Sequence, residues 1–184
     1  MPATGTPPYD LDTAQAGLWL LQDAHDHWLA DVAEMSGQRA GPEHRHLALR
    51  MHQHAASVLL WARGLDDLCG RDPDPLPSYR AARPSMAPVL AAARYAANRA
   101  VHQLHTLTRS VPGFAFPITF PLASDKLGRC DWAPEAVLPS VNSEWPGQQR
   151  LRAEYVSRMA GQPVGVTLQL LRDWFEQQLS VGSQ

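Results

Sequence analysis

Apolar residues recur every three or four positions along most of the chain, which is the spacing of one face of an α-helix. The first stripe predicts a helix from about Asp10 to Ser36 and contains Ala14, Leu18, Leu21, His25, Trp28, Val32 and Met35. The second predicts a helix from about Pro42 to Cys69 and contains Leu47, Met51, His54, Val58, Trp61, Leu65 and Leu68. Two long amphipathic helices joined by a short loop are expected to form an antiparallel hairpin.

Three further helices are expected after a proline-rich gap. Prolines crowd residues 70–84, so we expect irregular structure there. A third helix is expected to begin near Ser85, a good N-terminal cap, and to run to about Arg109. A fourth spans about Pro146 to Ala160, with Gly161 as its stop, and a fifth follows directly.

The segment between the third and fourth helices has a different pattern. Apolar and small residues alternate over 114–120, which is typical of a β-strand, and 130–138 is a second extended run. Its prolines favour an irregular hairpin over part of a large sheet. Trp132 and Trp145 are expected to be partly exposed there. The prediction is therefore a mainly α, up-and-down bundle of about five helices, with a short β-hairpin or extended insertion at about 112–145.

Length and composition fit one domain. The chain has 184 residues, of which 45% are hydrophobic, enough for a substantial core. We expect a disordered lead-in over 1–9 and a single domain over 10–181. No apolar run has the roughly 18 residues of a membrane span, and no export signal is visible. Cys69 and Cys130 are the only cysteines, so reduced thiols and a cytoplasmic location are expected, with no membrane association.

Charge is distributed unevenly, although the formal net charge is only −2. Residues 10–34 contain six acidic residues and neither Lys nor Arg, whereas 75–124 contain five arginines and no acid. Such a basic stretch could bind an anion such as phosphate. Alternatively, the acidic first helix packs beside it and neutralises it.

The third helix carries the residues with the clearest chemical potential. Steps of three and four place one polar set on a single helical face: Arg94, Asn98, His102, His105 and Arg109. The opposite side is small and apolar, with Ala97 among its members. Asn and His are poor helix formers, and no acid in this helix offsets the arginines. A functional face is therefore predicted, with an ordinary solvated face as the alternative.

The run Arg-Tyr-Ala-Ala-Asn-Arg-Ala-Val-His at 94–102 resembles the signature helix of the HEPN superfamily of helical-bundle proteins. That signature is typically Arg-Asn followed by three residues and His. Asn98 and His102 match it, whereas Ala97 stands where the Arg is expected. The resemblance covers this motif and the bundle-like pattern, but neither the proline-rich stretch nor the predicted hairpin.

This resemblance implies a metal-independent endoribonuclease of toxin or defence type, acting as a homodimer without a cofactor, and an RNA or antitoxin partner. In such a protein the His transfers a proton, the Arg holds the scissile phosphate and the Asn orients its neighbours. With Ala97 in the motif, Arg94 or Arg99 would have to hold the phosphate, or the protein binds RNA without cutting it. The predicted catalytic residues are His102, Asn98, Arg99 and Arg94, and the predicted binding residues are His105 and Arg109.

Two other functions remain open. One is a non-catalytic helical bundle that binds a protein partner through the polar face of the third helix. The other is a metal-dependent hydrolase whose histidines come from different helices. His25 and His54 lie on apolar stripes and are expected in the core, whereas other histidines crowd the start of the second helix. No particular metal ligand is predicted.

Overall fold

The computed structural model describes residues 11–37, 42–70, 77–102, 108–111, 129–138 and 146–180. This part of the chain forms five α-helices and one two-stranded antiparallel sheet. The helices are α1 (Leu11–Gly37), α2 (Pro42–Cys69), α3 (Pro77–His102), α4 (Pro146–Arg158) and α5 (Val164–Ser180). The predicted mainly α helical bundle is confirmed.

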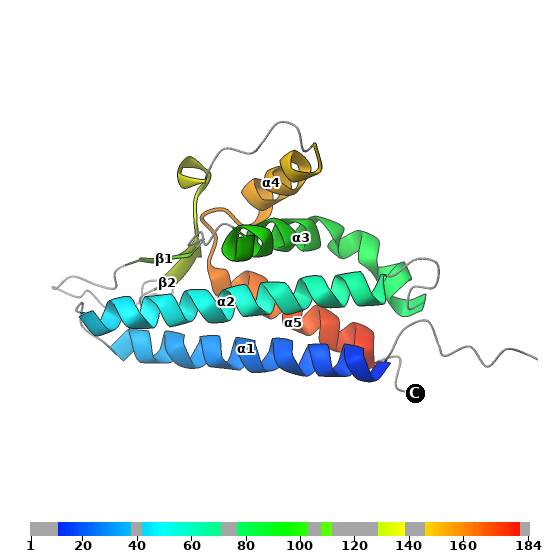
Figure 1. Cartoon of the computed structure of the whole chain (residues 1–184), viewed down its shortest axis with the longest axis horizontal. Coiled ribbons are helices and arrows are strands. Elements are labelled where there is room, and N and C mark those ends of the chain that lie inside the picture. Colours follow the sequence, from blue (N-terminus) through cyan, green and yellow to red (C-terminus); the bar gives the residue numbers. More distant parts are fainter. Residues whose placement is uncertain are drawn as a thin grey trace, which may run out of the picture.

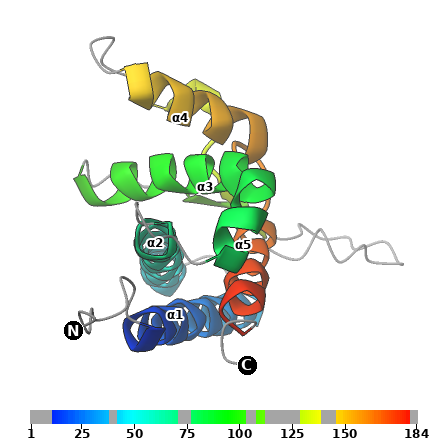
Figure 2. The same ribbon diagram turned by 90° about the vertical axis from the view of Figure 1, so that its right-hand side faces the viewer.

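The long hairpin of α1 and α2 is the base of the bundle, and α5 packs against both of these helices. Helix α3 lies on α2, and α4 covers the other side of α3 (Figure 1). Figure 2, in which α2 is seen nearly end-on, shows α3 running across it rather than alongside it. Helix α3 is therefore enclosed between α2 and α4.

The helical stripes supply the core, as the apolar spacing predicts. Leu21 and Trp28 of α1, Met51 of α2 and Leu168 and Phe175 of α5 are all at most 5% exposed. Burying each large apolar side chain stabilises the fold by about 1.5–3 kcal/mol. Gly161 has a φ of +72°, the left-handed conformation that favours glycine after a helix, and confirms the predicted stop after α4.

The start of α3 differs from the sequence prediction. The helix begins at Pro77 rather than near Ser85, so the expectation of irregular structure is wrong for residues 77–84. Pro77 occupies the first helical position, where its missing N–H costs no hydrogen bond. Pro84 lies inside the helix and removes one such bond. The buried Tyr79 and the more exposed Arg83 both donate hydrogen bonds to Asp66 of α2, and these contacts favour helix in this stretch.

The end of α3 and the insertion also differ. Helix α3 stops at His102 instead of continuing to Arg109. Further along the chain, Thr108–Val111 form a strand, β1, which pairs with β2 (Arg129–Trp132) in antiparallel register. The predicted strand at 114–120 lies outside the described residues. The predicted extended run at 130–138 is strand only as far as Trp132, because Glu135–Val137 form a 3-10 turn.

Strand β2 is fixed to the helices by Trp132. This side chain is 1% exposed, which corrects the expectation of partial exposure. Its Nε1–H donates to Oγ1 of Thr167 on α5 at 3.1 Å, and the Tyr155 hydroxyl of α4 donates to the Ala133 carbonyl at 2.9 Å. The two-stranded sheet is thus held by both late helices. Trp145 lies outside the described residues.

Candidate functional site

The polar residues of α3 meet α2 at a buried carboxylate. Asp66 lies near the end of α2, with its side chain only 3% exposed. Its Oδ1 accepts hydrogen bonds from the Tyr79 hydroxyl at 2.5 Å and from Arg83 Nε at 2.8 Å, while its Oδ2 accepts from Arg94 Nη2 at 3.1 Å. We call this group, together with the exposed Asp67 next to it, the Asp66 cluster.

The Asp66 cluster keeps its carboxylate charged inside the bundle. Burial alone would raise the pKa of Asp66, but hydrogen bonds from Arg83 and Tyr79 and the charges of Arg83 and Arg94 outweigh it. The pKa of Asp66 is therefore below its usual value. Burial and the neighbouring Asp66 charge raise the pKa of the Cys69 thiol to about 11, so this buried cysteine stays protonated at neutral pH.

Arg94, predicted to hold phosphate, is held by carboxylates instead. Its Nη2 donates to Oδ2 of Asp66 and to Oδ1 of Asp67. The acids absent from the third helix are thus supplied by α2, and not by the first helix as the alternative had it. Arg94 is 28 positions from Asp66 and 27 positions from Asp67 in the sequence. These pairs form only because α3 packs on α2.

Asn98 lies one turn further along the same face, at a second contact with α2. Nη1 of Arg63 donates to Oδ1 of Asn98 at 2.5 Å, and both side chains are half-buried. Nε of Arg63 is also 3.7 Å from Oδ2 of Asp67. Asp67 thereby lies between Arg63 and Arg94. We call the contact of Arg63 with Asn98 the Arg63–Asn98 pair.

Arg99 points to the other side of α3. It is 4% exposed, and its guanidinium carbon lies 5.1 Å from the centre of the Tyr95 ring. The Tyr95 ring lies 5.2 Å from that of Tyr155 on α4, so Arg99 is enclosed in the α3–α4 interface. Ala97 is fully buried, which confirms that it belongs to the apolar side of the helix. The structure therefore does not bring Arg99 together with Arg94 and Asn98.

The remaining predicted site residues are separated by the end of α3. His102 is the last residue of that helix, one turn after Asn98, and its side chain is outside the described part. His105 also lies outside the described residues. Arg109 is on β1 opposite Asp131, so it does not continue the helical face. The predicted face of five residues is wrong for Arg109, because the backbone there pairs with β2 instead of forming helix.

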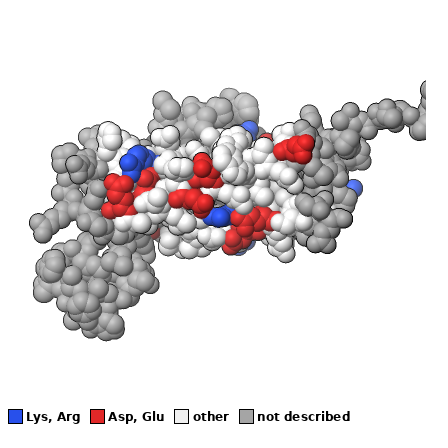
Figure 3. Space-filling model, turned by 90° about the horizontal axis from the view of Figure 1, so that it is seen from below, with Lys and Arg blue, Asp and Glu red and all other residues white. Residues whose placement is uncertain are grey.

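Acidic residues of α1 pair with arginines of α2 and α5 rather than with the described arginines of α3. Helix α1 packs on α2 and α5. In Figure 3, which views the molecule from below, acidic side chains outnumber basic ones among the described residues. The acids of α1 pair with Arg50 of α2 and Arg172 of α5. A nucleic acid would be repelled by this face, whereas α3 lies on the opposite side of α2.

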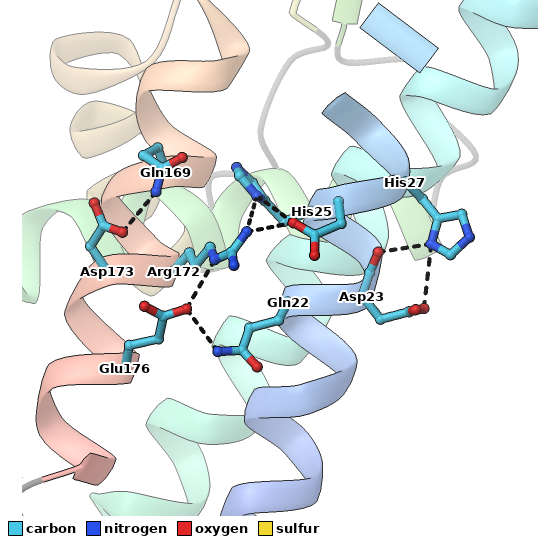
Figure 4. A network of polar contacts seen from close by, with 9 residues as sticks. Gln22, Asp23, His25, His27, Gln169, Arg172, Asp173 and Glu176 are labelled. Atoms are coloured by element: carbon cyan, nitrogen blue, oxygen red, sulfur yellow. Dashed lines mark hydrogen bonds and ion pairs between the residues drawn. The ribbon is translucent and has the colours of Figure 1, made fainter. Parts of the chain in front are cut away.

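A buried histidine lies where α1 meets α5. Figure 4 shows Arg172 of α5 between three groups: Nη1 is 3.0 Å from Nδ1 of His25 and 2.5 Å from Oδ1 of Asp26, and Nε is 2.9 Å from Oε1 of Glu176. Because a guanidinium only donates, Nδ1 of His25 accepts, and the proton of the neutral ring is on Nε2. Burial, followed by the charge of Arg172, lowers the pKa of His25. His25 is a core histidine, as predicted.

This lowered pKa predicts acid destabilisation. Between the folded pKa and the unfolded value of 6.5, the unfolded chain binds a proton that the folded chain does not. Stability is therefore expected to fall as the pH drops below 6.5. Thermal unfolding between pH 7.5 and pH 5 would measure this, and His25→Gln, which cannot be protonated, should flatten the profile.

His27→Gln, which replaces an exposed histidine of the same helix and leaves the contacts of His25 with Arg172 in place, is the matched variant for comparison. An unchanged pH profile in His25→Gln would show that other groups cause the acid sensitivity.

The metal-dependent alternative requires histidines from different helices to meet. In the described parts of α1 to α5 and the two strands, no group of three or more His, Cys, Asp or Glu is arranged to hold an ion. His54 was expected in the core, but its side chain is 23% exposed. Its Nδ1 lies 2.8 Å from Oδ2 of the buried Asp31. Arg50 donates to the other oxygen of Asp31 at 2.7 Å.

Comparisons with models of protein families, with curated proteins and with solved structures found no match. Among the described residues, no helix is both long and apolar enough to cross a membrane.

Sequence reasoning missed Arg63 and Asp66, although both carried a weak signal. Asp66 follows Leu65 of the apolar stripe directly, at the edge of the buried face, and a carboxylate that is buried is almost always paired. Arg63 and Asp67 are four positions apart, a spacing that indicated only a surface ion pair.

Proposed function

We propose that this protein is a HEPN-like RNA-binding protein whose site is formed by Arg63, Asn98 and His102. The observation that supports this most is the Arg63–Asn98 pair, which puts a cation from α2 beside the polar face of α3, one turn before His102. Arg63 thereby places a guanidinium beside Asn98, whereas the motif would carry its arginine at position 97. Arg94, Arg99, His105 and Arg109 are not part of this proposed site.

The orientation of Asn98 suits an anion. A guanidinium has donors only, so the oxygen of the Asn98 amide must face Arg63. The NH₂ group then faces away from Arg63 and has two N–H groups that can donate to a ligand. Arg63, which is 34% exposed in its side chain, has further N–H groups of its own. Together the two residues can present several donors to one phosphate.

The charge of the surroundings also favours an anion. Arg63, Arg83 and Arg94 face the carboxylates of Asp66 and Asp67, which leaves one positive charge in excess. Because Asp66 is buried and its oxygens are occupied by α3, it offers no repulsive surface to RNA. The exposed Asp67 opposes binding and limits the affinity of a single chain.

In a catalytic version of this proposal, His102 transfers the proton. The imidazole accepts the proton of a ribose 2′-hydroxyl, whose oxygen attacks the neighbouring phosphorus while the bond to the 5′-oxygen breaks. The 5′-oxygen leaves with the electron pair and takes a proton from water, which gives a 2′,3′-cyclic phosphate and a 5′-hydroxyl. Arg63 holds the phosphate oxygens on which negative charge builds. No metal is required in these steps. Two chains, with their α3 ends facing each other, would give the homodimer of toxin or defence type, in the cytoplasm.

The test is cleavage and binding of end-labelled RNA by the purified protein in EDTA. His102→Ala should reduce cleavage by about 100-fold or more, which is the usual contribution of a general acid or base. Arg63→Ala should weaken binding and cleavage together. Arg80→Ala is the matched control, since Arg80 is an exposed arginine of α3.

Each outcome has a definite meaning. Binding that depends on Arg63 without cleavage would leave an RNA-binding protein and remove the nuclease. The absence of both binding and cleavage in the wild-type protein would exclude the proposal. Restoring the motif by Ala97→Arg is not a clean test, because Ala97 is fully buried and the larger side chain would disrupt the core.

A protein partner, such as an antitoxin, is the second candidate. Trp19 on α1 is 62% exposed, and aromatic side chains are enriched in protein interfaces. If RNA does not bind, co-purification with and without Trp19→Ser becomes the next measurement.

A further inference from the structure

We propose that His27 and His54 form a two-histidine site for an exchangeable divalent transition metal ion such as Zn²⁺. The two residues come from α1 and α2, and their ring centres are 5.4 Å apart at an interplanar angle of 47°. This site is separate from the RNA site proposed on α3 and does not depend on it.

Both rings have the same proton arrangement. Nδ1 of His27 lies 2.8 Å from the Asp23 carbonyl oxygen, and Nδ1 of His54 lies 2.8 Å from Oδ2 of Asp31. A carbonyl and a carboxylate oxygen only accept, so each Nδ1 carries the proton and donates it. In the neutral rings both Nε2 atoms are therefore unprotonated, which is the state a metal ion binds.

The separation of the rings fits two ligands on one ion. With Zn–N bonds of about 2.0–2.1 Å and tetrahedral geometry, two imidazoles bound through Nε2 have ring centres roughly 5 Å apart. Metal-binding histidines usually donate their second N–H to a carboxylate or a backbone carbonyl, which fixes the ring. Asp31 and the Asp23 carbonyl occupy these positions.

Access and charge agree with this proposal. The side chains of His27 and His54 are 59% and 23% exposed, and His27 projects from α1 away from the Arg172 network (Figure 4). Nearby, the carboxylates of Asp23, Asp31 and Glu34 outnumber the one guanidinium of Arg50 that pairs with two of them. A cation is favoured at such a place.

The site supplies two protein ligands. Among the described residues no third candidate ligand joins them, so a bound ion would keep positions open for water or another ligand. Such a site releases and rebinds its ion readily, and it follows the usual order in which Cu²⁺ binds more tightly than Zn²⁺.

Titration calorimetry with Zn²⁺ at pH 7.5 tests the proposal, using variants that keep side-chain volume. The wild type should bind one ion per chain. His27→Gln and His54→Gln should each weaken binding by about ten-fold or more, and Asp31→Asn by about ten-fold through loss of ring orientation. His46 is an exposed histidine of α2, the helix of His54, and the His46→Gln variant should bind Zn²⁺ as the wild type does.

A nitrogen-detected NMR spectrum of the histidines supplies a second readout. Without metal, His27 and His54 should show the Nδ1–H tautomer, and Zn²⁺ should shift the Nε2 signals of these two residues. Circular dichroism confirms that each variant is folded. Equal Zn²⁺ binding by the wild type and the double variant His27→Gln/His54→Gln would overturn the proposal, as would no binding by the wild type at millimolar Zn²⁺.

Discussion

Replacing Asp66 with alanine is expected to lower the free energy of unfolding by about 3–5 kcal/mol, the usual cost of removing one partner from a buried charged network. The substitution leaves the Tyr79 hydroxyl and the guanidinium groups of Arg83 and Arg94 without their common acceptor. Urea denaturation at pH 7, followed by the helical signal, measures the loss.

Asp67→Ala is the matched control for Asp66→Ala. Asp67 is the next residue and also pairs with Arg94, but its side chain is 51% exposed, so its loss should cost about 1 kcal/mol or less. Similar losses for the two variants would contradict the view that burial makes Asp66 the anchor of α3.

The Asp66 cluster also predicts how the difference in free energy of unfolding between the wild type and Asp66→Ala depends on pH. Because the folded pKa of Asp66 is below the unfolded value of 3.8, its charge stabilises the fold fully above 3.8. That contribution is lost as the pH falls through the lower, folded pKa. The stability difference between the two proteins should therefore be constant from pH 7 to about pH 5 and shrink only in stronger acid.

Trp132→Ala is expected to destabilise the protein by about 3–5 kcal/mol, as is usual when a large buried aromatic side chain is removed. Trp132 is 1% exposed and joins β2 to α5 through Thr167, so its loss leaves a cavity and releases the sheet from the helices. Chemical denaturation measures the change.

Trp132→Phe and Thr167→Val separate packing from hydrogen bonding. Each removes the bond from Nε1 to Oγ1 while keeping most of the buried volume, so each should cost about 1–2 kcal/mol. If Trp132→Ala were as mild as these variants, the aromatic ring would not be the anchor of β2.

The residue pattern predicts the local features of this fold but not the contacts between distant segments, such as those of Asp66 and Trp132. The structure confirms the predicted stripes of α1 and α2, the position of α5 and the stop at Gly161. These could be predicted because helical periodicity and a left-handed glycine are local properties. The start of α3 was predicted wrongly. Pro84 argues against helix locally, whereas contacts with residues far away in the sequence, such as Asp66, which lies 17 positions before its partner Arg83, favour helix there.

The candidate site divides in the same way. The sequence by itself determined that Asn98 and His102 lie one turn apart on a helix and that Ala97 faces the apolar side. Only the tertiary structure decided that Arg94 is held by Asp66 and Asp67 and that Arg99 is buried beside Tyr95. It also decided that Arg63 meets Asn98 from α2.

The physical reason lies in the range of each interaction. Spacing along one helix fixes which side chains share a face, because the backbone geometry repeats every 3.6 residues. The partner of a charged side chain depends on which helix docks there, and burial makes that choice decisive, since a charge removed from water must find its counter-charge. For this protein, the sequence determined the helices and their faces, and the packing of α3 between α2 and α4 determined the partners of its arginines.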